Sequence, residues 1–175
     1  MRCKYTVAKR YCIKLLCKTV LTVVQTKKSK TMSLIQKALS QYGIREIAGK
    51  VANPQIIRYF ETLGYDGNKL HDETAWCSAF VNWVTKTQNY PYSGKLNARS
   101  WLNIGESTAI PALGDIVILW RESPSSWKGH VGFYIKQTKR YVYVLGGNQN
   151  NSVSIKAYPK NRILDYKKLY KNGEI

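Results

Sequence analysis

Acidic residues are scarce in this 175-residue chain, which has 10 Asp+Glu against 28 Lys+Arg and a formal net charge of +18. Residues 1–31 contain nine of the basic residues and no acidic residue, so half of the excess charge lies in the first sixth of the chain. A basic surface favours polyanionic partners: nucleic acid, anionic lipid or an anionic cell wall. Charge alone does not choose among these.

The chain also lacks an apolar run long enough to span a bilayer. The longest run, YCIKLLCKTVLTVVQ at 11–25, contains two lysines and is not followed by a small-x-small cleavage site. It fits a poor signal sequence, an interfacial basic amphipathic helix or a segment upstream of a second start at Met32. We predict that residues 1–31 lie outside the fold and that 32–175 form a single domain.

Cysteine is unevenly distributed, with Cys3, Cys12 and Cys17 near the N-terminus and only Cys77 elsewhere. A disulfide framework would place paired cysteines throughout the fold. The spacing does not match the Cys-x-x-Cys pairs of a zinc site either. We predict four free thiols, no metal and no cofactor.

Hydrophobic periodicity predicts helices first and strands afterwards, with no internal repeat. The predicted helices are residues 33–43, 53–64 and 72–86, followed by a short helix at 97–104. The predicted strands are 115–121, 130–137, 141–149, 152–159 and 163–168. This order predicts an α+β domain in which N-terminal helices pack on a small antiparallel sheet.

The stretch TAWCSAFVNW, residues 74–83, contains the candidate nucleophile. A free cysteine is more often a packing residue, but Cys77 lies near the start of a helix that we expect Asp72 to cap, where the helix dipole lowers a thiol pKa. Of the two histidines, His71 lies just before the same helix, whereas His130 opens a strand and is the candidate base. A metal site built from these side chains would have no fourth ligand at a sensible spacing.

A hairpin supplies a candidate third residue. If residues 138–140, TKR, form a three-residue loop, His130 lies opposite Asn148 and Gly132 opposite Gly146. Directly opposed side chains have Cβ atoms about 4.5–5.5 Å apart, so Asn148 could fix the imidazole tautomer. The two glycines would leave a bare patch where a helix could bring the nucleophile close.

Five segments together resemble a known family: DETAWCSAFVNWV, ARSWLNIG, PALGDIVIL, GHVGFYI and VLGGNQNNSVSI. They are similar to the papain-like cell-wall peptidases of the CHAP and NlpC type, in particular to a compact phage- and prophage-associated branch. The resemblance covers about residues 33–168 in order, and EIAGKVANPQI upstream keeps that branch's Glu-x-x-Gly-x-x-x-Asn-Pro pattern. Residues 1–31 have no counterpart.

The resemblance implies a papain-like fold and a peptidoglycan hydrolase, either a muramoyl-alanine amidase or a stem or cross-bridge endopeptidase. It also implies a triad of Cys77, His130 and Asn148. Many CHAP relatives have an acidic residue where this chain has Gly146, so the third role rests on Asn148 here. The implied place of action is the bacterial cell wall, periplasm or exterior, reached through phage lysis or an atypical export route.

Four residues near the predicted catalytic pair are candidate substrate contacts. Trp120 and Trp127 flank the loop before the catalytic histidine. Ser78 could contribute a backbone N–H to an oxyanion hole. Trp76 adjoins the nucleophile, although a core position suits it better.

The partner expected from the resemblance is peptidoglycan, with an anionic wall or membrane surface as a further partner of residues 1–31. We expect a monomer and no specific nucleic-acid partner, because no helix-turn-helix, zinc-finger or RNP signature occurs. Two alternatives remain open at this point. One is a basic nucleic-acid-binding protein, and the other is a papain-like protease or deamidase that acts on protein.

Overall fold

The structure, a computed structural model, describes residues 32–49, 51–72 and 74–173. The chain divides into two compact units, Met1–Met32 and Ser33–Ile175. The predictions for residues 1–31, including the three N-terminal thiols, lie outside the described residues. Within the described ranges, no helix is long and apolar enough to cross a membrane.

Local sequence signals account for the first two helices. The α-helices are α2 (Leu34–Leu39), α3 (Pro54–Glu61) and α4 (Cys77–Thr87), and short 3-10 helices span Gly67–Lys69, Ala98–Asn103 and Lys160–Arg162. Ser33 and Gln36 form a capping box at the start of α2. Asn53 caps α3 with Pro54 at its first position. These features confirm the helices predicted from the same residues.

The third helix begins later than predicted. Its N-cap is Trp76, with no side-chain cap bond, and its first residue is Cys77. Asp72 is fully buried and does not cap α4. Its Oδ2 accepts from the backbone N–H groups of Ile47, at 3.0 Å, and Asn53, at 2.7 Å. The prediction that Asp72 caps this helix is therefore wrong, because the loop before α3 binds its carboxylate instead.

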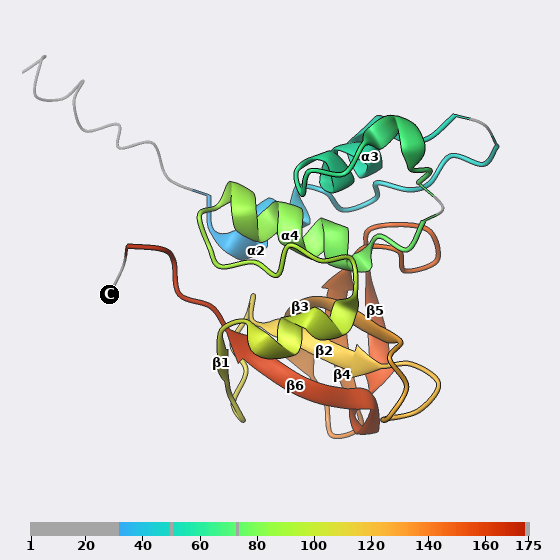
Figure 1. Cartoon of the computed structure of the whole chain (residues 1–175). Helices are drawn as coiled ribbons and strands as arrows, with labels where there is room; N and C mark the ends of the chain where they lie inside the picture. The colour runs from blue at the N-terminus through green and yellow to red at the C-terminus, as the bar shows by residue number, and fades with distance from the viewer. Residues whose placement is uncertain (1–31, 50, 73, 174–175) are drawn as a thin grey trace, which may run out of the picture. The chain divides into compact units, whose positions relative to one another are not determined.

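Six antiparallel strands form one sheet in the order β1-β6-β2-β3-β4-β5 (Figure 1). Their bounds are Glu106–Ser107, Ile116–Trp120, Gly129–Gln137, Tyr141–Gly146, Ser154–Pro159 and Ile163–Lys168. The last five confirm the predicted strands. The two-residue β1, which pairs with β6, was not predicted. The α+β class with an antiparallel sheet is confirmed.

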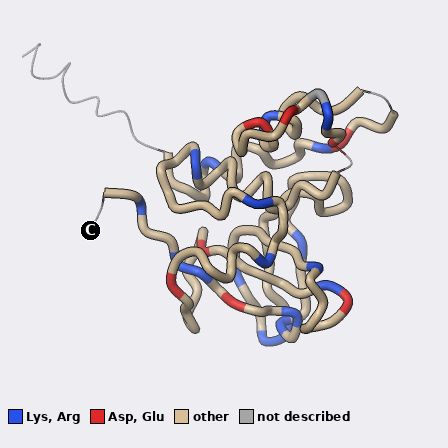
Figure 2. Tube along the Cα trace, in the orientation of Figure 1, with Lys and Arg blue, Asp and Glu red and all other residues tan. Residues whose placement is uncertain are grey.

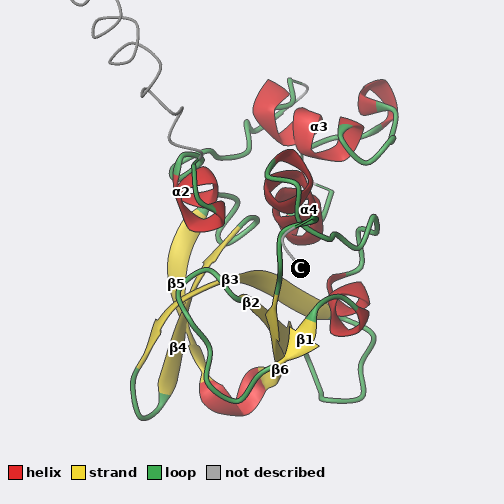
Figure 3. Cartoon of the chain, turned by 90° about the vertical axis from the view of Figure 1, so that its left-hand side faces the viewer, coloured by secondary structure: helices red, strands yellow, loops and turns green. Residues whose placement is uncertain are grey.

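The two faces of the sheet have different coverings. Helix α4 packs against β3 (Figure 3). The side chains of Val131 and Phe133 belong to the large core cluster on this side, and the Phe80 ring of α4 meets Phe133 edge-on at 5.9 Å. The opposite face carries a smaller cluster that includes Leu119 and Tyr134. His130 is paired with Leu119 across β2 and β3. Because directly paired residues share a face, His130 lies on the side of the sheet away from α4.

The β3–β4 hairpin has the expected register at its far end. At the end far from the turn, Phe133 pairs with Leu145 and Tyr134 pairs with Val144, which is the register that a three-residue loop would give. Near the turn, however, Gln137 pairs with Val142, and a bulge at Ile135 shifts the register by one residue. The predicted register therefore holds at Phe133 and Tyr134, whereas the predicted three-residue loop is wrong, because it would pair Gln137 with Tyr141.

Candidate active site

The thiol of Cys77 lines a cavity of about 570 Å³ that His130 also lines. Cys77 is the first residue of α4 and only 7% exposed. Burial raises the pKa of its thiol, and the backbone groups of Val131 and Ser78 and the charge of Arg121 act in the opposite direction. The thiol therefore lies beside the backbone of Val131 in β3, and Val131 directly follows the candidate base His130.

Backbone N–H groups at the start of α4 lie close to the thiol, because those of Ser78 and Cys77 contribute to lowering its pKa. The first intrahelical bond runs from the Phe80 N–H to the Trp76 carbonyl, at 2.9 Å. The N–H groups before it, including those of Cys77 and Ser78, have no acceptor within the helix. Such donors can stabilise the oxyanion of a tetrahedral intermediate.

A neighbouring amide and a neighbouring ring hold the His130 imidazole. His130 is 5% exposed, and its Nε2 lies 3.1 Å from Oε1 of Gln149. The Tyr158 ring packs against the imidazole with centroids 5.4 Å apart and an interplanar angle of 32°. The ring therefore has a fixed position between β5 and the loop after β4.

Hydrogen bonding assigns the tautomer. Nε2 of Gln149 donates to the carbonyl of Val144, at 3.3 Å, and to that of Ser154, while its Oε1 accepts from the Tyr158 hydroxyl at 3.0 Å. A flipped amide would set its oxygen against two carbonyls, so Oε1 faces the imidazole. His130 must then donate from Nε2, which leaves Nδ1 as the basic atom of the neutral ring.

Burial keeps both candidate groups neutral at rest. The pKa of His130 is lowered to about 4, chiefly by burial; the Gln149 hydrogen bond raises it, and the charges of Arg121 and Lys156 add to the lowering. Burial also raises the pKa of the Cys77 thiol. At neutral pH the pair is therefore a thiol and a neutral imidazole, and the imidazole can act as a general base.

The hydrogen-bond partner predicted for His130 is corrected by the structure. Asn148 lines the cavity but forms no hydrogen bond with His130; Gln149 makes that bond. The reason is local, because β4 ends at Gly146 and Asn148 adopts a left-handed conformation, with φ of 55°. The run of asparagines in GGNQNN is typical of left-handed turns, and this signal could have warned that the strand register does not extend to Asn148.

The glycines have different roles from the one predicted. Helix α4 packs on the face away from His130, so Gly132 and Gly146 do not form a patch for it. Gly147 does meet the helix: a Cβ there would lie 2.5 Å from Cζ3 of Trp76 and 2.8 Å from Cβ of Phe80. The start of α4 thus reaches the open end of the sheet at Gly147.

The thiol and the imidazole therefore approach from opposite faces and meet at the end of the sheet. Both residues line the cavity of about 570 Å³, yet among the described residues no hydrogen bond joins Cys77 to His130. Catalytic hydrogen bonds are commonly long in free enzymes and tighten when substrate binds. The cavity provides the space in which a substrate carbonyl would lie between the two groups.

The four predicted substrate contacts divide into two pairs. Trp127 is 70% exposed and lines the larger cavity, and Trp120 lines a second cavity beside it. Trp76 is fully buried, so its ring cannot contact substrate. The Ser78 side chain is also buried and donates to the Lys95 carbonyl at 2.6 Å, so it cannot contact substrate.

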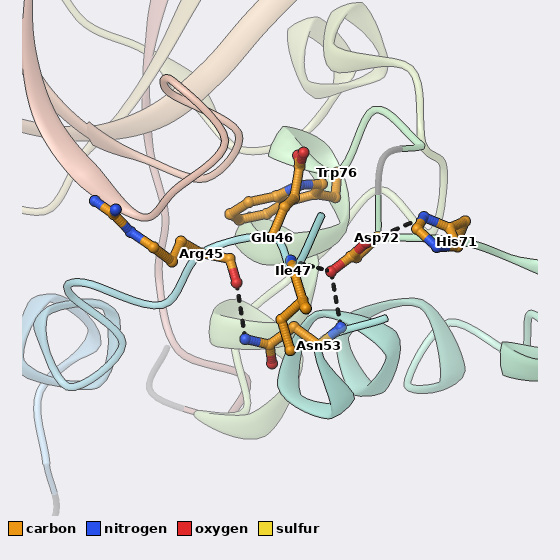
Figure 4. A network of polar contacts seen from close by, with 7 residues as sticks. All are labelled: Arg45, Glu46, Ile47, Asn53, His71, Asp72 and Trp76. Atoms are coloured by element: carbon orange, nitrogen blue, oxygen red, sulfur yellow. Dashed lines mark hydrogen bonds and ion pairs between the residues drawn. The ribbon is translucent and has the colours of Figure 1, made fainter. Parts of the chain in front are cut away.

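A buried polar network anchors the segment that leads into Cys77 (Figure 4). The Trp76 indole N–H donates to Oε1 of Glu46 at 2.7 Å. Asp72 ties the same segment to the loop before α3, and its Oδ1 lies 3.1 Å from Nδ1 of His71. His71 is half-buried and adjoins this carboxylate. These contacts fix the N-cap of α4.

Among the described residues, no group of three or more His, Cys, Asp or Glu side chains could hold a metal ion. No protein-family model matches the chain. No curated protein is similar enough to it in sequence to count as a match.

Proposed function

We propose that the chain is a peptidoglycan hydrolase that cleaves an amide bond with Cys77 as nucleophile and His130 as general base. One observation carries this proposal: a thiol at a free helix N-terminus and an imidazole with Nδ1 left as its acceptor line the same cavity. A helix that begins with the nucleophile and packs on an antiparallel sheet bearing the base also supports a papain-like fold.

The chemistry follows from these positions. As Sγ of Cys77 attacks the carbonyl carbon, Nδ1 of His130 takes the thiol proton. The Gln149 carbonyl oxygen then stabilises the imidazolium through the Nε2 proton. The N–H groups at the start of α4 stabilise the oxyanion. The imidazolium protonates the leaving amine, and a water molecule, deprotonated by the same base, releases the acyl group from the thioester.

Three features support peptidoglycan as the substrate. The segments around Cys77 and His130 resemble those of CHAP and NlpC peptidases, as described above. The net charge of +18 suits an anionic wall. The exposed Trp127 ring at the larger cavity provides a flat apolar surface for a sugar or a peptide stem. The amidase and endopeptidase activities both fall within this proposal.

Digestion of purified peptidoglycan tests the proposal, with mass spectrometry of the new termini to identify the bond. We expect soluble fragments from the wild type and none from Cys77→Ala at equal thermal stability. Fragments from the Cys77→Ala protein would show that another group performs the attack.

An unlabelled protein such as casein serves as the second substrate. Cleavage of casein without release from the wall would assign the same chemistry to a protein substrate.

A further inference from the structure

A second cavity adjoins the catalytic one. It has a volume of about 320 Å³, and His130, Asn148, Arg121 and Arg162 line both cavities. Lys156 lines the second cavity but not the first. A group bound there would therefore lie directly beside the reacting carbonyl.

The second cavity is positively charged and has no acidic residue among those that line it. Arg121, Lys156 and Arg162, here called the cation triplet, take part in none of the ion pairs found among the described residues. The one acid of the larger cavity, Glu122, is paired with Lys128 at 2.6 Å. Figure 2 shows that lysine and arginine occur along both the sheet and the helices.

The partners of the triplet within the chain are neutral. The Arg162 guanidinium lies 5.3 Å from the centroid of the Trp120 ring. Nζ of Lys156 is 3.4 Å from Oδ1 of Asn150 and lies 5.8 Å from the centroid of the Tyr158 ring. Three cations in one concave site that has no acidic residue in its lining are typical of a site for an anionic ligand.

Catalysis supplies an independent reason for an anion at this place. The charges of Arg121 and Lys156 oppose protonation of His130, yet the proposed mechanism forms the imidazolium at each turnover. An anion beside these two cations would offset their effect and stabilise the imidazolium. Substrate binding would then make the base stronger.

We propose that the cation triplet binds a carboxylate of the substrate, on the residue next to the scissile amide. The planar fork of an arginine guanidinium suits a carboxylate in two-point contact. The assignment to a carboxylate on the peptide stem rests on the proposed function. The existence of the anion site does not depend on the proposed function, because it follows from the cavity and its charges.

Alkylation of Cys77 in the full-length protein tests the site without requiring hydrolysis. Iodoacetate carries a carboxylate and iodoacetamide does not, so the ratio of their rate constants at Cys77 reports attraction of an anion into the cavities. We expect Arg121→Gln and Arg162→Gln each to lower this ratio by up to about 5-fold, the scale of one partly exposed charge interaction. Mass spectrometry of the Cys77 peptide separates its reaction from that of the other thiols.

The matched control is Arg140→Gln, an exposed arginine in the β3–β4 turn at the opposite end of β3 from His130. Its ratio should equal that of the wild type, and Arg121→Lys should retain most of the preference for iodoacetate. Unchanged ratios in both Arg→Gln proteins, with thermal midpoints preserved, would overturn the anion site.

The substrate assignment needs a second measurement: kcat/KM on two stem peptides that differ only by a free carboxylate or a carboxamide beside the scissile bond. Arg162→Gln should reduce kcat/KM about 5-fold more for the carboxylate peptide than for the carboxamide peptide. Equal losses on both peptides would contradict carboxylate recognition. No turnover of either peptide or of the wall by the wild type would instead refute the proposed function, while the alkylation ratio still decides the anion site.

Discussion

A Cβ atom at Gly146 would lie 3.0 Å from Nε2 of His130. It would also lie 3.1 Å from Oε1 of Gln149. The bare backbone at this position therefore makes room for the hydrogen bond between the imidazole and the amide. Gln149 reaches the ring from the turn that follows β4.

This relationship predicts that Gly146→Ala will impair the base. The added methyl group should displace the amide from the ring and lower kcat by about 10-fold, equivalent to about 1.4 kcal/mol. Gly132→Ala is the contrasting variant, because its Cβ would lie 2.5 Å from Cγ1 of Val144 and not against His130. We expect it to lower the free energy of unfolding by about 1–3 kcal/mol. Steady-state kinetics and denaturant unfolding of both proteins would distinguish the two effects.

Removal of the amide that holds His130 should reduce turnover more than removal of its neighbour. Gln149→Ala should lower kcat by roughly 10- to 1000-fold, if orientation of the ring contributes about 1.4–4 kcal/mol. Asn148→Ala, which removes no recorded hydrogen bond, is the matched control and should have a smaller effect. A larger loss in Asn148→Ala than in Gln149→Ala would restore Asn148 as the third catalytic residue.

The Tyr158 hydroxyl should contribute through Gln149. Tyr158→Phe keeps the ring that packs on His130 but loses the 3.0 Å hydrogen bond to Oε1 of Gln149. A hydrogen bond of this kind contributes about 0.5–1.5 kcal/mol, so kcat should fall by roughly 2- to 12-fold with KM unchanged. An increase in KM at constant kcat would mean that the hydroxyl contacts substrate.

The buried neutral imidazole should make stability depend on pH. The pKa of His130 falls from 6.5 in the unfolded chain to about 4 in the folded one. Between these values the unfolded histidine binds a proton that the folded one does not, so stability falls as the pH drops through this window. The loss should reach about 3 kcal/mol by pH 4. Denaturant unfolding of wild type and His130→Asn at several pH values measures it, and equal pH dependence in both would contradict a neutral buried ring.

Residues 1–31 should be dispensable for hydrolysis. A protein that starts at Met32 should keep its thermal midpoint and its rate on soluble muropeptides. Its binding to an anionic wall should weaken and depend less on salt, because half of the excess positive charge is removed. Sedimentation with purified walls at several salt concentrations measures the binding. A thermal midpoint lower by many degrees would place the segment in the core.

The sequence by itself determined most of the secondary structure, because the signals involved are local. Ser33, Asn53 and Pro54 are placed where a helix start needs an oxygen acceptor or a fixed φ. Apolar runs between turn residues located five of the six strands. The start of α4 was missed because the carboxylate of Asp72 binds backbone donors distant in the sequence, which no local pattern reveals.

The sequence also determined which atoms could carry the proposed chemistry: one cysteine within residues 33–175 and one histidine on a strand. Only the tertiary structure decided their partners. The left-handed turn after β4 brings Gln149 to His130 in place of Asn148, and Gly147 lets α4 approach the end of the sheet. A hydrogen bond near 3 Å depends on backbone angles and packing summed over many residues, which hydrophobic periodicity does not encode. The cation triplet was undetected for the same reason, since three separate segments converge on one cavity only in the folded chain.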